Sequence, residues 1–140
     1  MKIRYTNSNE DPKHAQLVKG LVGYNDEAGP LEHWEWVAFY AEDDDGTLLG
    51  GVQGNFEWDY LAIKRLWVAK QDNGLGGILL KEAEDFARSK NKKGVWLDTF
   101  AFQAKGFYEK QGYKVFGMIP NAAGAHDRYF LCKRFEEADE

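Results

Sequence analysis

Residues 66–80 read LWVAKQDNGLGGILL and join an apolar strand, a glycine-rich loop and the start of an amphipathic helix. Gly74, Gly76 and Gly77 let the backbone approach a ligand closely. The helix start directs unpaired N–H groups and a positive dipole end at that ligand. Apolar residues then recur at the spacing of one helix face, at Leu75, Ile78, Leu79, Ala83, Phe86 and Ala87. The stretch therefore predicts a strand–loop–helix junction that binds an anionic group such as a phosphate.

The glycines alone leave other interpretations of this loop open. A strand-to-helix junction needs small residues for packing even where no ligand binds. A nucleoside-triphosphate loop is excluded, because no Lys-Ser or Lys-Thr pair follows the second glycine. A dinucleotide-binding fold stays open, since Asp98 lies at a suitable distance to contact a ribose, although sheet-like sequence precedes the loop.

Two motifs, in the right order and spacing, resemble those of a known family. Gln71-x-x-Gly74-x-Gly76 resembles the acyl-CoA pyrophosphate loop of the GNAT N-acetyltransferase superfamily. Downstream, the segment Ala104-x-x-Phe107-Tyr108-Glu109-Lys110-x-Gly112-Tyr113 resembles the late helix of that family and the strand after it. The resemblance covers residues 32–135 and is similar to small, single-domain bacterial acetyltransferases.

This resemblance implies a fold and an activity. The fold class is α/β (α+β), the GNAT acyl-CoA N-acyltransferase fold, with a mixed, mostly antiparallel central sheet of about seven strands flanked by helices. The implied activity is that of an acetyl-CoA-dependent N-acetyltransferase, in which a primary amine of a small molecule or peptide attacks the acetyl group directly. Acetyl-CoA is the cosubstrate, and no metal is required.

The resemblance also implies the site residues. The CoA pyrophosphate is expected at the glycine loop and the pantetheine arm beside the strand before it, so the cofactor-binding candidates are Leu66, Trp67, Val68, Gln71, Asn73, Gly74, Leu75, Gly76, Gly77 and Tyr108. Tyr108 is also the candidate general acid that protonates the leaving thiolate. Glu57 is a candidate general base, with Glu35, Asp59 and His126 as alternatives.

A competing interpretation is a non-catalytic acyl-CoA-binding or interaction domain of the same fold. Two departures from the family pattern favour it. Only Ala69 and Lys70 separate Val68 from Gln71, and Ala101 stands where the family often has Asn.

Length and composition limit the possible domain organisation, partners and location of the protein. The 140 residues, 44% of them hydrophobic, predict a single N-acetyltransferase domain over residues 1–135 and an acidic tail over residues 136–140. A net charge of −5 disfavours a nucleic-acid partner, and no apolar run approaches membrane-spanning length. Cys132 has no intrachain partner and no signal peptide follows Met1, so a cytoplasmic location is predicted. The predicted partners are acetyl-CoA and an amine acceptor, and a homodimer is left open.

Hydrophobic patterns and turn residues predict the order of the elements. Strands are predicted at residues 3–6, 34–41, 47–56, 60–68, 95–99, 113–119 and 128–135, and helices at residues 11–23, 74–90 and 102–111. Residues 43–46 are predicted to form a hairpin turn rather than a metal site, and residues 120–127 a loop. Three glycines in one strand predict a bulge or a close backbone approach, at Gly50, Gly51 and Gly54.

Overall fold

A computed structural model describes residues 1–26, 35–70 and 73–136. The chain divides into two units, Met1–Glu32 and His33–Glu140, and each is described by itself. In the first unit the described residues form one helix, α1 (Lys13–Asp26). Asp11 Oδ1 accepts a hydrogen bond of 2.9 Å from the Lys13 N–H and so caps the start of this helix.

Two predictions for the first unit are wrong. Residues 3–6 form no strand, because the described part of this unit offers them no strand to pair with. The helix also continues past Gly23 to Asp26. Gly23 does not adopt the left-handed conformation with which glycine ends a helix.

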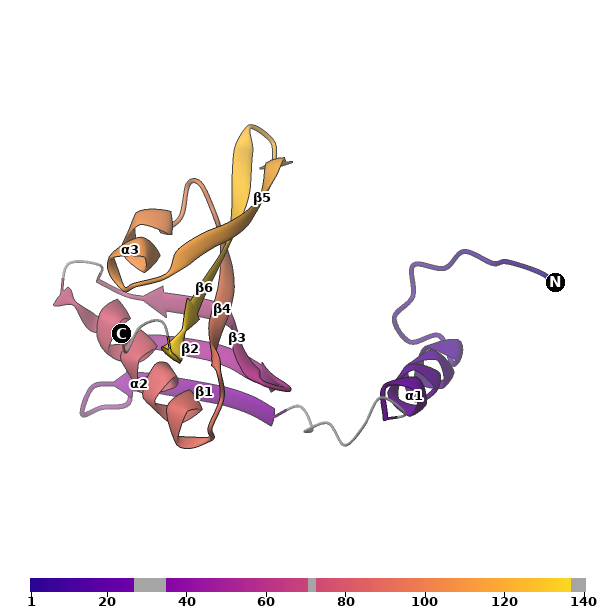
Figure 1. The fold of residues 1–140 in the computed structure, drawn as a ribbon, viewed down its shortest axis with the longest axis horizontal. Coiled ribbons are helices and arrows are strands. Elements are labelled where there is room, and N and C mark those ends of the chain that lie inside the picture. Colours follow the sequence, from indigo (N-terminus) through magenta and orange to yellow (C-terminus); the bar gives the residue numbers. More distant parts are fainter. Residues whose placement is uncertain (27–34, 71–72, 137–140) are drawn as a thin grey trace. The chain divides into compact units, whose positions relative to one another are not determined.

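The second unit is built on a six-stranded sheet with the order β1-β2-β3-β4-β6-β5 (Figure 1). The strands are β1 (Glu35–Glu42), β2 (Leu48–Glu57), β3 (Tyr60–Val68), β4 (Gly94–Phe100), β5 (Lys114–Ala123) and β6 (His126–Arg134). Among these, β3 and β4 pair in parallel and the other neighbours are antiparallel. The mixed, mostly antiparallel sheet is confirmed, with six described strands instead of about seven because residues 3–6 contribute none.

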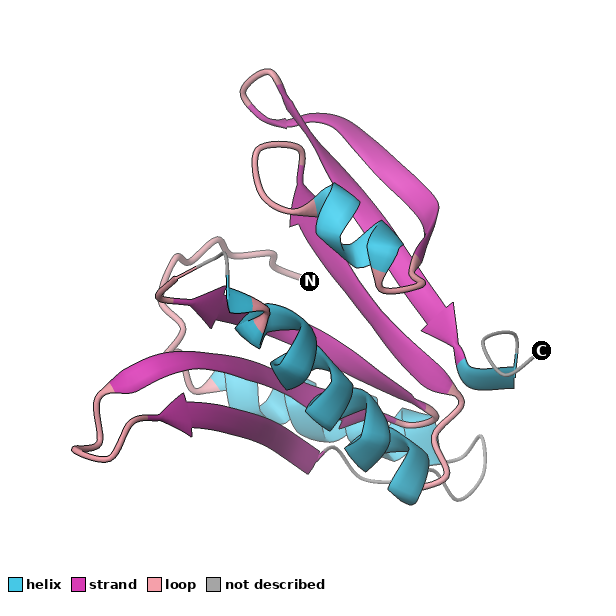
Figure 2. Cartoon of the chain, turned by 90° about the vertical axis from the view of Figure 1, so that its left-hand side faces the viewer, coloured by secondary structure: helices cyan, strands magenta, loops and turns pink. Residues whose placement is uncertain are grey.

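Two helices, α2 (Leu75–Ser89) and α3 (Lys105–Lys110), lie against the same face of the sheet (Figure 2). Of the predicted apolar stripe of α2, Leu79, Ala83 and Ala87 lie in the core, and Leu75 and Phe86 pack against it. Ile78 is wrongly included in the stripe, because it is 59% exposed, and Leu80 is buried in the core instead. The buried side chains of α2 cluster with Val95 and Leu97 of β4 and Leu131 of β6. The opposite face of the sheet carries no helix of this unit within its described residues.

Two predicted boundaries near the carboxyl end are wrong. Residues 120–127 are not a loop, because β5 continues to Ala123 and β6 begins at His126. Since β5 is the edge of the sheet, Pro120 can lie in it without removing a ladder hydrogen bond. Helix α3 begins at Lys105, later than predicted, because Gln103 Oε1 accepts a 2.7 Å hydrogen bond from the Phe100 N–H and holds the preceding residues in a turn.

The glycines of β2 explain how β3 is bent. Gln53 pairs with Arg65 and Gly54 with Ile63, which leaves Lys64 as an extra residue in β3. A Cβ atom on Gly54 would overlap the Ala62 carbonyl oxygen. The predicted close approach is therefore confirmed at Gly54. The extra residue beside Gly54 belongs to β3 and not to the strand that carries the glycines, and a bulge bends its strand.

Candidate active site

The two central strands, β3 and β4, separate after Ala62, just before the bulge at Lys64. Strand β3 pairs with β4 at three positions, from Tyr60–Gly94 to Ala62–Trp96, and the described strands then diverge (Figure 2). From Ile63 onward the edge of β3 that faces β4 therefore has backbone groups without a strand partner. Such an edge can accept an extended ligand as an additional strand.

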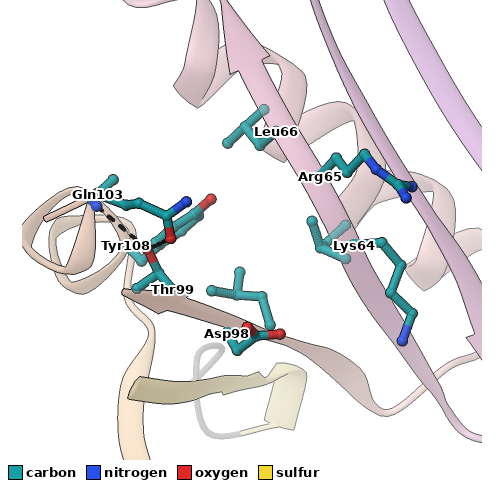
Figure 3. Close-up of a pocket in the computed structure, with 10 residues that line it drawn as sticks. Lys64, Arg65, Leu66, Asp98, Thr99, Gln103 and Tyr108 are labelled. Carbon is teal, nitrogen blue, oxygen red and sulfur yellow. Dashed lines mark hydrogen bonds between the residues drawn. The ribbon is translucent and has the colours of Figure 1, made fainter. Parts of the chain in front are cut away.

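A pocket of about 240 Å³ opens in this gap. Figure 3 shows Leu66 of β3 on one side of the gap and Tyr108 of α3 on the other. The lining residues come from β3, β4 and the segment that leads into and through α3: Ile63, Lys64, Arg65, Leu66, Leu97, Asp98, Thr99, Gln103, Ala104 and Tyr108. The structure thus brings together Leu66 and Tyr108, two of the predicted site residues.

Tyr108 is only 7% exposed, and its ring lies edge to face against the rings of Phe107 and Tyr113 at centroid distances of 5.1 and 6.0 Å. Burial, together with the nearby charge of Asp98, raises the pKa of Tyr108 to about 12. Its hydroxyl therefore stays protonated at neutral pH. A protonated hydroxyl that lines a pocket can donate a proton to a reacting atom there.

A buried network fixes the helix that carries Tyr108. Gly112 ends α3 with φ of 96°, and the Tyr113 N–H bonds to the Tyr108 carbonyl at 3.1 Å, so Gly112 has the helix-ending role typical of glycine. The Tyr113 hydroxyl donates to the buried Glu84 of α2 at 2.8 Å. Lys133 Nζ of β6 donates to the same carboxylate at 3.0 Å. Helices α2 and α3 are thereby joined to the sheet, and Tyr108 is held in place.

The start of α2 has the features of an anion site. Gly74 has φ of 76°, a left-handed conformation that favours glycine, and Asn73 Oδ1 accepts a 3.1 Å hydrogen bond from the Leu75 N–H. The N–H groups of Gly76 and Gly77 have no acceptor among the described residues. No acidic residue occupies the first turn of α2. Backbone donors at the positive end of a helix fit a phosphate.

Packing against α3 does not by itself require glycine at Gly76 or Gly77. A Cβ on Gly76 would lie 3.4 Å from the Phe107 ring, and one on Gly77 would lie 3.5 Å from the Gln111 amide. Both distances are those of ordinary van der Waals contact, so a Cβ atom would fit at either position. Gly74 differs, because open space surrounds its Cβ position and only its φ calls for glycine.

The other predicted CoA-binding residues of β3 do not line the pocket. Trp67 and Val68 lie beyond the pocket, at the end of β3 that leads toward α2. The Trp67 side chain is exposed, and Val68 packs against the core. Gln71 lies outside the described residues, as do residues 137–140 of the predicted acidic tail.

None of the four candidate bases is among the residues that line the pocket. Glu57 Oε1 lies 3.2 Å from Lys64 Nζ, and Asp59 Oδ2 lies 3.1 Å from Lys93 Nζ. Glu35 stands at the first position of β1. His126 is the first residue of β6, and its ring packs against the Phe102 ring at a centroid distance of 4.8 Å. His126 therefore lies in a strand and not in the predicted loop.

The carboxylate that does line the pocket is Asp98, which the sequence suggested only as a ribose contact. Arg128 Nε donates to Asp98 Oδ2 at 2.7 Å, and this bond raises the pKa of Arg128. One feature of the sequence could have indicated Asp98, because it is an acidic residue in a mostly apolar strand, where a carboxylate is rarely found without a partner. The dinucleotide interpretation is wrong, because a sheet with one parallel strand pair is not a doubly wound fold.

Comparison with known proteins identifies the family. The model of the Acetyltransferase (GNAT) family matches residues 9–113. The chain belongs to the GNAT family. Blasticidin-S acetyltransferase of Streptomyces morookaense is 39% identical to it over 110 residues, which cover 76% of this chain and 79% of the relative. An acetyltransferase of Agrobacterium fabrum is 30% identical over 95 residues, 66% of this chain and 69% of the relative.

Solved structures of GNAT proteins have the same fold. The crystal structure of an acetyltransferase from Bacillus cereus superposes with a TM-score of 0.85 and 28% identity, covering 94% of this chain and 97% of that one. A Bacillus anthracis structure in complex with acetyl coenzyme A has a TM-score of 0.64 at 21% identity, over 76% of this chain and 64% of that one. The predicted fold and family are thus confirmed, and this GNAT protein is an acetyl-CoA-dependent N-acetyltransferase. Within its described residues, no helix is long and apolar enough to cross a membrane.

Proposed function

We propose that this enzyme transfers the acetyl group of acetyl-CoA to a primary amine of a small molecule or peptide in the gap between β3 and β4. One observation carries the proposal: the buried Tyr108 side chain lines a pocket at the place where β3 loses its strand partner. The Streptomyces relative is named for blasticidin S, which supports a small-molecule acceptor.

In this proposal the donor binds along one continuous path. The pyrophosphate accepts hydrogen bonds from the N–H groups of Gly76 and Gly77 at the start of α2, which have no acceptor among the described residues, and the family motif implies Gln71 as a further contact. The pantetheine arm follows the unpaired edge of β3 over residues 66–68. This path brings the thioester into the pocket beside Tyr108.

The chemistry then needs a proton for sulfur and a neutral amine. The amine nitrogen forms a bond to the acetyl carbon, the carbon–sulfur bond breaks, and the Tyr108 hydroxyl gives its proton to the departing sulfur. The amine loses a proton to a base or to water, and Tyr108 is reprotonated from solvent. Glu57, the predicted base, pairs with Lys64 and is not among the residues that line the pocket, so the proposal does not assign it this step.

Residues 1–135 are proposed to act as a single domain, since the family match spans residues 9–113 and so includes parts of both units. A cytoplasmic location belongs to the same proposal, because a chain with one cysteine needs no oxidising compartment for intrachain disulfides. The sequence leaves a homodimer open, and light scattering on the purified chain tests for one.

Two measurements on the purified chain test the proposal. CoA should raise the melting temperature and NAD should not, because only a ligand held by the native fold stabilises it by mass action. Thiol release from acetyl-CoA should then increase with at least one member of a panel of amines, polyamines and peptides. A rise in melting temperature with CoA, but no acetyl transfer to any amine, would favour the non-catalytic acyl-CoA-binding domain instead. Equal shifts with CoA and NAD, or no shift with either, would contradict the proposed donor site.

A further inference from the structure

The sheet face opposite α2 and α3 carries a row of aromatic and charged side chains beside the reactive gap. Side chains alternate along a strand, so the buried Val95 and Leu97 of β4 face the helices while Trp96, Asp98 and Phe100 face the other way. Their register partners on β6 are Cys132, Phe130 and Arg128 in that order. This opposite face is therefore chemically distinct from the helix-covered one.

A carboxylate is held firmly on this face. Asp98 Oδ2 accepts the 2.7 Å bond from Arg128 Nε, and the Arg128 guanidinium lies 5.6 and 5.1 Å from the ring centroids of Phe100 and Phe130. These contacts fix the guanidinium and, through it, Asp98. Asp98 Oδ1 accepts no hydrogen bond from the described residues. One carboxylate oxygen at the gap is therefore open to a cationic group. That group must share the pocket with Lys64 and Arg65, and the Lys64 ammonium already lies 5.2 Å from the centroid of the Trp96 ring.

An apolar groove of about 590 Å³ adjoins this carboxylate. Four of its six lining residues are aromatic: it is lined by Tyr60, Trp96, Phe116, Phe130, Cys132 and Arg134. Trp96 precedes Asp98 by two positions on β4, and same-face neighbours in a strand lie about 7 Å apart. A ring in the groove and an ammonium at Asp98 can thus belong to one small molecule.

In the proposed reaction, acetyl-CoA and the amine reach the gap from opposite faces of the sheet. The start of α2 and Tyr108 of α3 lie on the helix-covered face, so the donor occupies that side. The acceptor must reach the acetyl carbon from the side left open, where Asp98 and the groove lie. Asp98 lines the same pocket as Tyr108, so an amine at Asp98 is close to the reacting atoms.

We infer that the acceptor of this enzyme is an arylalkylamine, whose ammonium binds Asp98 and whose ring fills the groove between Trp96 and Phe116. The inference rests on the proposed acetyl transfer and specifies its substrate. Aromatic faces and apolar lining favour a flat ring by burial and stacking. A polyamine or another extended polycation would need several carboxylates, and this groove places one beside the gap.

The experiment compares 2-phenylethylamine with ethylamine, which lacks only the ring, and with spermidine as a polycation. The parent enzyme should show kcat/KM for 2-phenylethylamine on the order of tenfold or more above that for ethylamine, because the ring adds apolar burial. Trp96→Ala should reduce this ratio severalfold, whereas Trp36→Ala on β1, an equally large change at an exposed tryptophan outside both pockets, should leave it unchanged. Asp98→Asn should raise KM for both monoamines and leave CoA affinity unaltered.

Folding and donor binding are checked separately. Melting temperature and CoA affinity are measured for every variant, and Phe116→Ala, at a side chain 64% exposed, provides a groove variant with little risk to folding. A ratio near one in the parent, a preference for spermidine, or a ratio that neither groove variant reduces would overturn the inference and leave the proposed function standing. Failure to acetylate any amine would reject both the proposed acetyl transfer and the arylalkylamine acceptor. The change in melting temperature with CoA then shows whether the proposed donor site is also wrong.

Discussion

The two edges of β3 differ in how they are paired. The edge that faces β2, here called the closed edge, is paired with a strand, whereas the edge that faces β4, the open edge, borders a gap beyond Ala62. On one edge β2 pairs with β3 along its whole length, from Tyr60–Glu57 to Val68–Gly50, and only glycine fits where the two backbones approach most closely. On the other edge β4 pairs at three positions and then leaves a pocket. One strand thus serves the fold on one side and the reaction on the other. Substitutions beside the closed edge should change stability, and those beside the open edge should change binding or rate.

The largest expected effect belongs to the closed edge. Gly54→Ala places a Cβ atom into the Ala62 carbonyl, which is backbone and cannot move without breaking the pairing. We expect a loss of about 3 kcal/mol or more in the free energy of unfolding, measured by denaturant titration.

The matched control is Gly117→Ala in β5, another strand glycine, whose Cβ position meets nothing within 4 Å. It should change stability by less than about 1 kcal/mol. Equal losses at the two positions would show that close approach is not why β2 contains Gly54.

The open edge should show the opposite pattern at Tyr108. Tyr108→Phe keeps the ring contacts with Phe107 and Tyr113 but removes the proton donor. We expect kcat to fall on the order of a hundredfold while CoA affinity and melting temperature hardly move. Steady-state kinetics on an amine that the parent acetylates well measure this. A fall in stability with kcat preserved per folded molecule would instead make Tyr108 a structural residue.

The two edges were not equally predictable from sequence. The bounds of β3 and the close backbone approach at a glycine of β2 follow from local patterns, and the structure confirms them. The Asp98–Arg128 ion pair joins residues thirty positions apart, so no local pattern predicts it. The bounds of β5 were missed for a similar reason, because only its position at the sheet edge makes Pro120 acceptable in a strand.

A smaller effect is expected at the start of α2, where the open edge ends. Asn73→Asp keeps the acceptor for the Leu75 N–H and adds a negative charge at the positive helix end, so the melting temperature should stay level or rise. The same charge repels a pyrophosphate bound there, by about 1 kcal/mol, or roughly fivefold in the Kd for CoA. Calorimetric titration measures the Kd.

Asn73→Ser is the neutral control, since its hydroxyl can cap the helix without adding charge. The weakening by Asn73→Asp should also shrink at high salt, because salt screens exposed charges. Unchanged CoA affinity in Asn73→Asp at low salt would argue that the pyrophosphate does not bind at this helix start.

The smallest effect returns to the closed edge, at Glu57 on β2. Its carboxylate pairs with Lys64 at 3.2 Å and does not line the pocket, so Glu57→Gln should lose only a partly exposed ion pair, worth less than about 1 kcal/mol. The value of kcat/KM should stay within about threefold of the parent at every pH from neutral to mildly alkaline. A general base behaves differently, because its loss lowers kcat/KM strongly and removes the ascending limb of the pH profile. That result would show that the closed edge supplies a reacting group, and the division between the two edges of β3 would not hold.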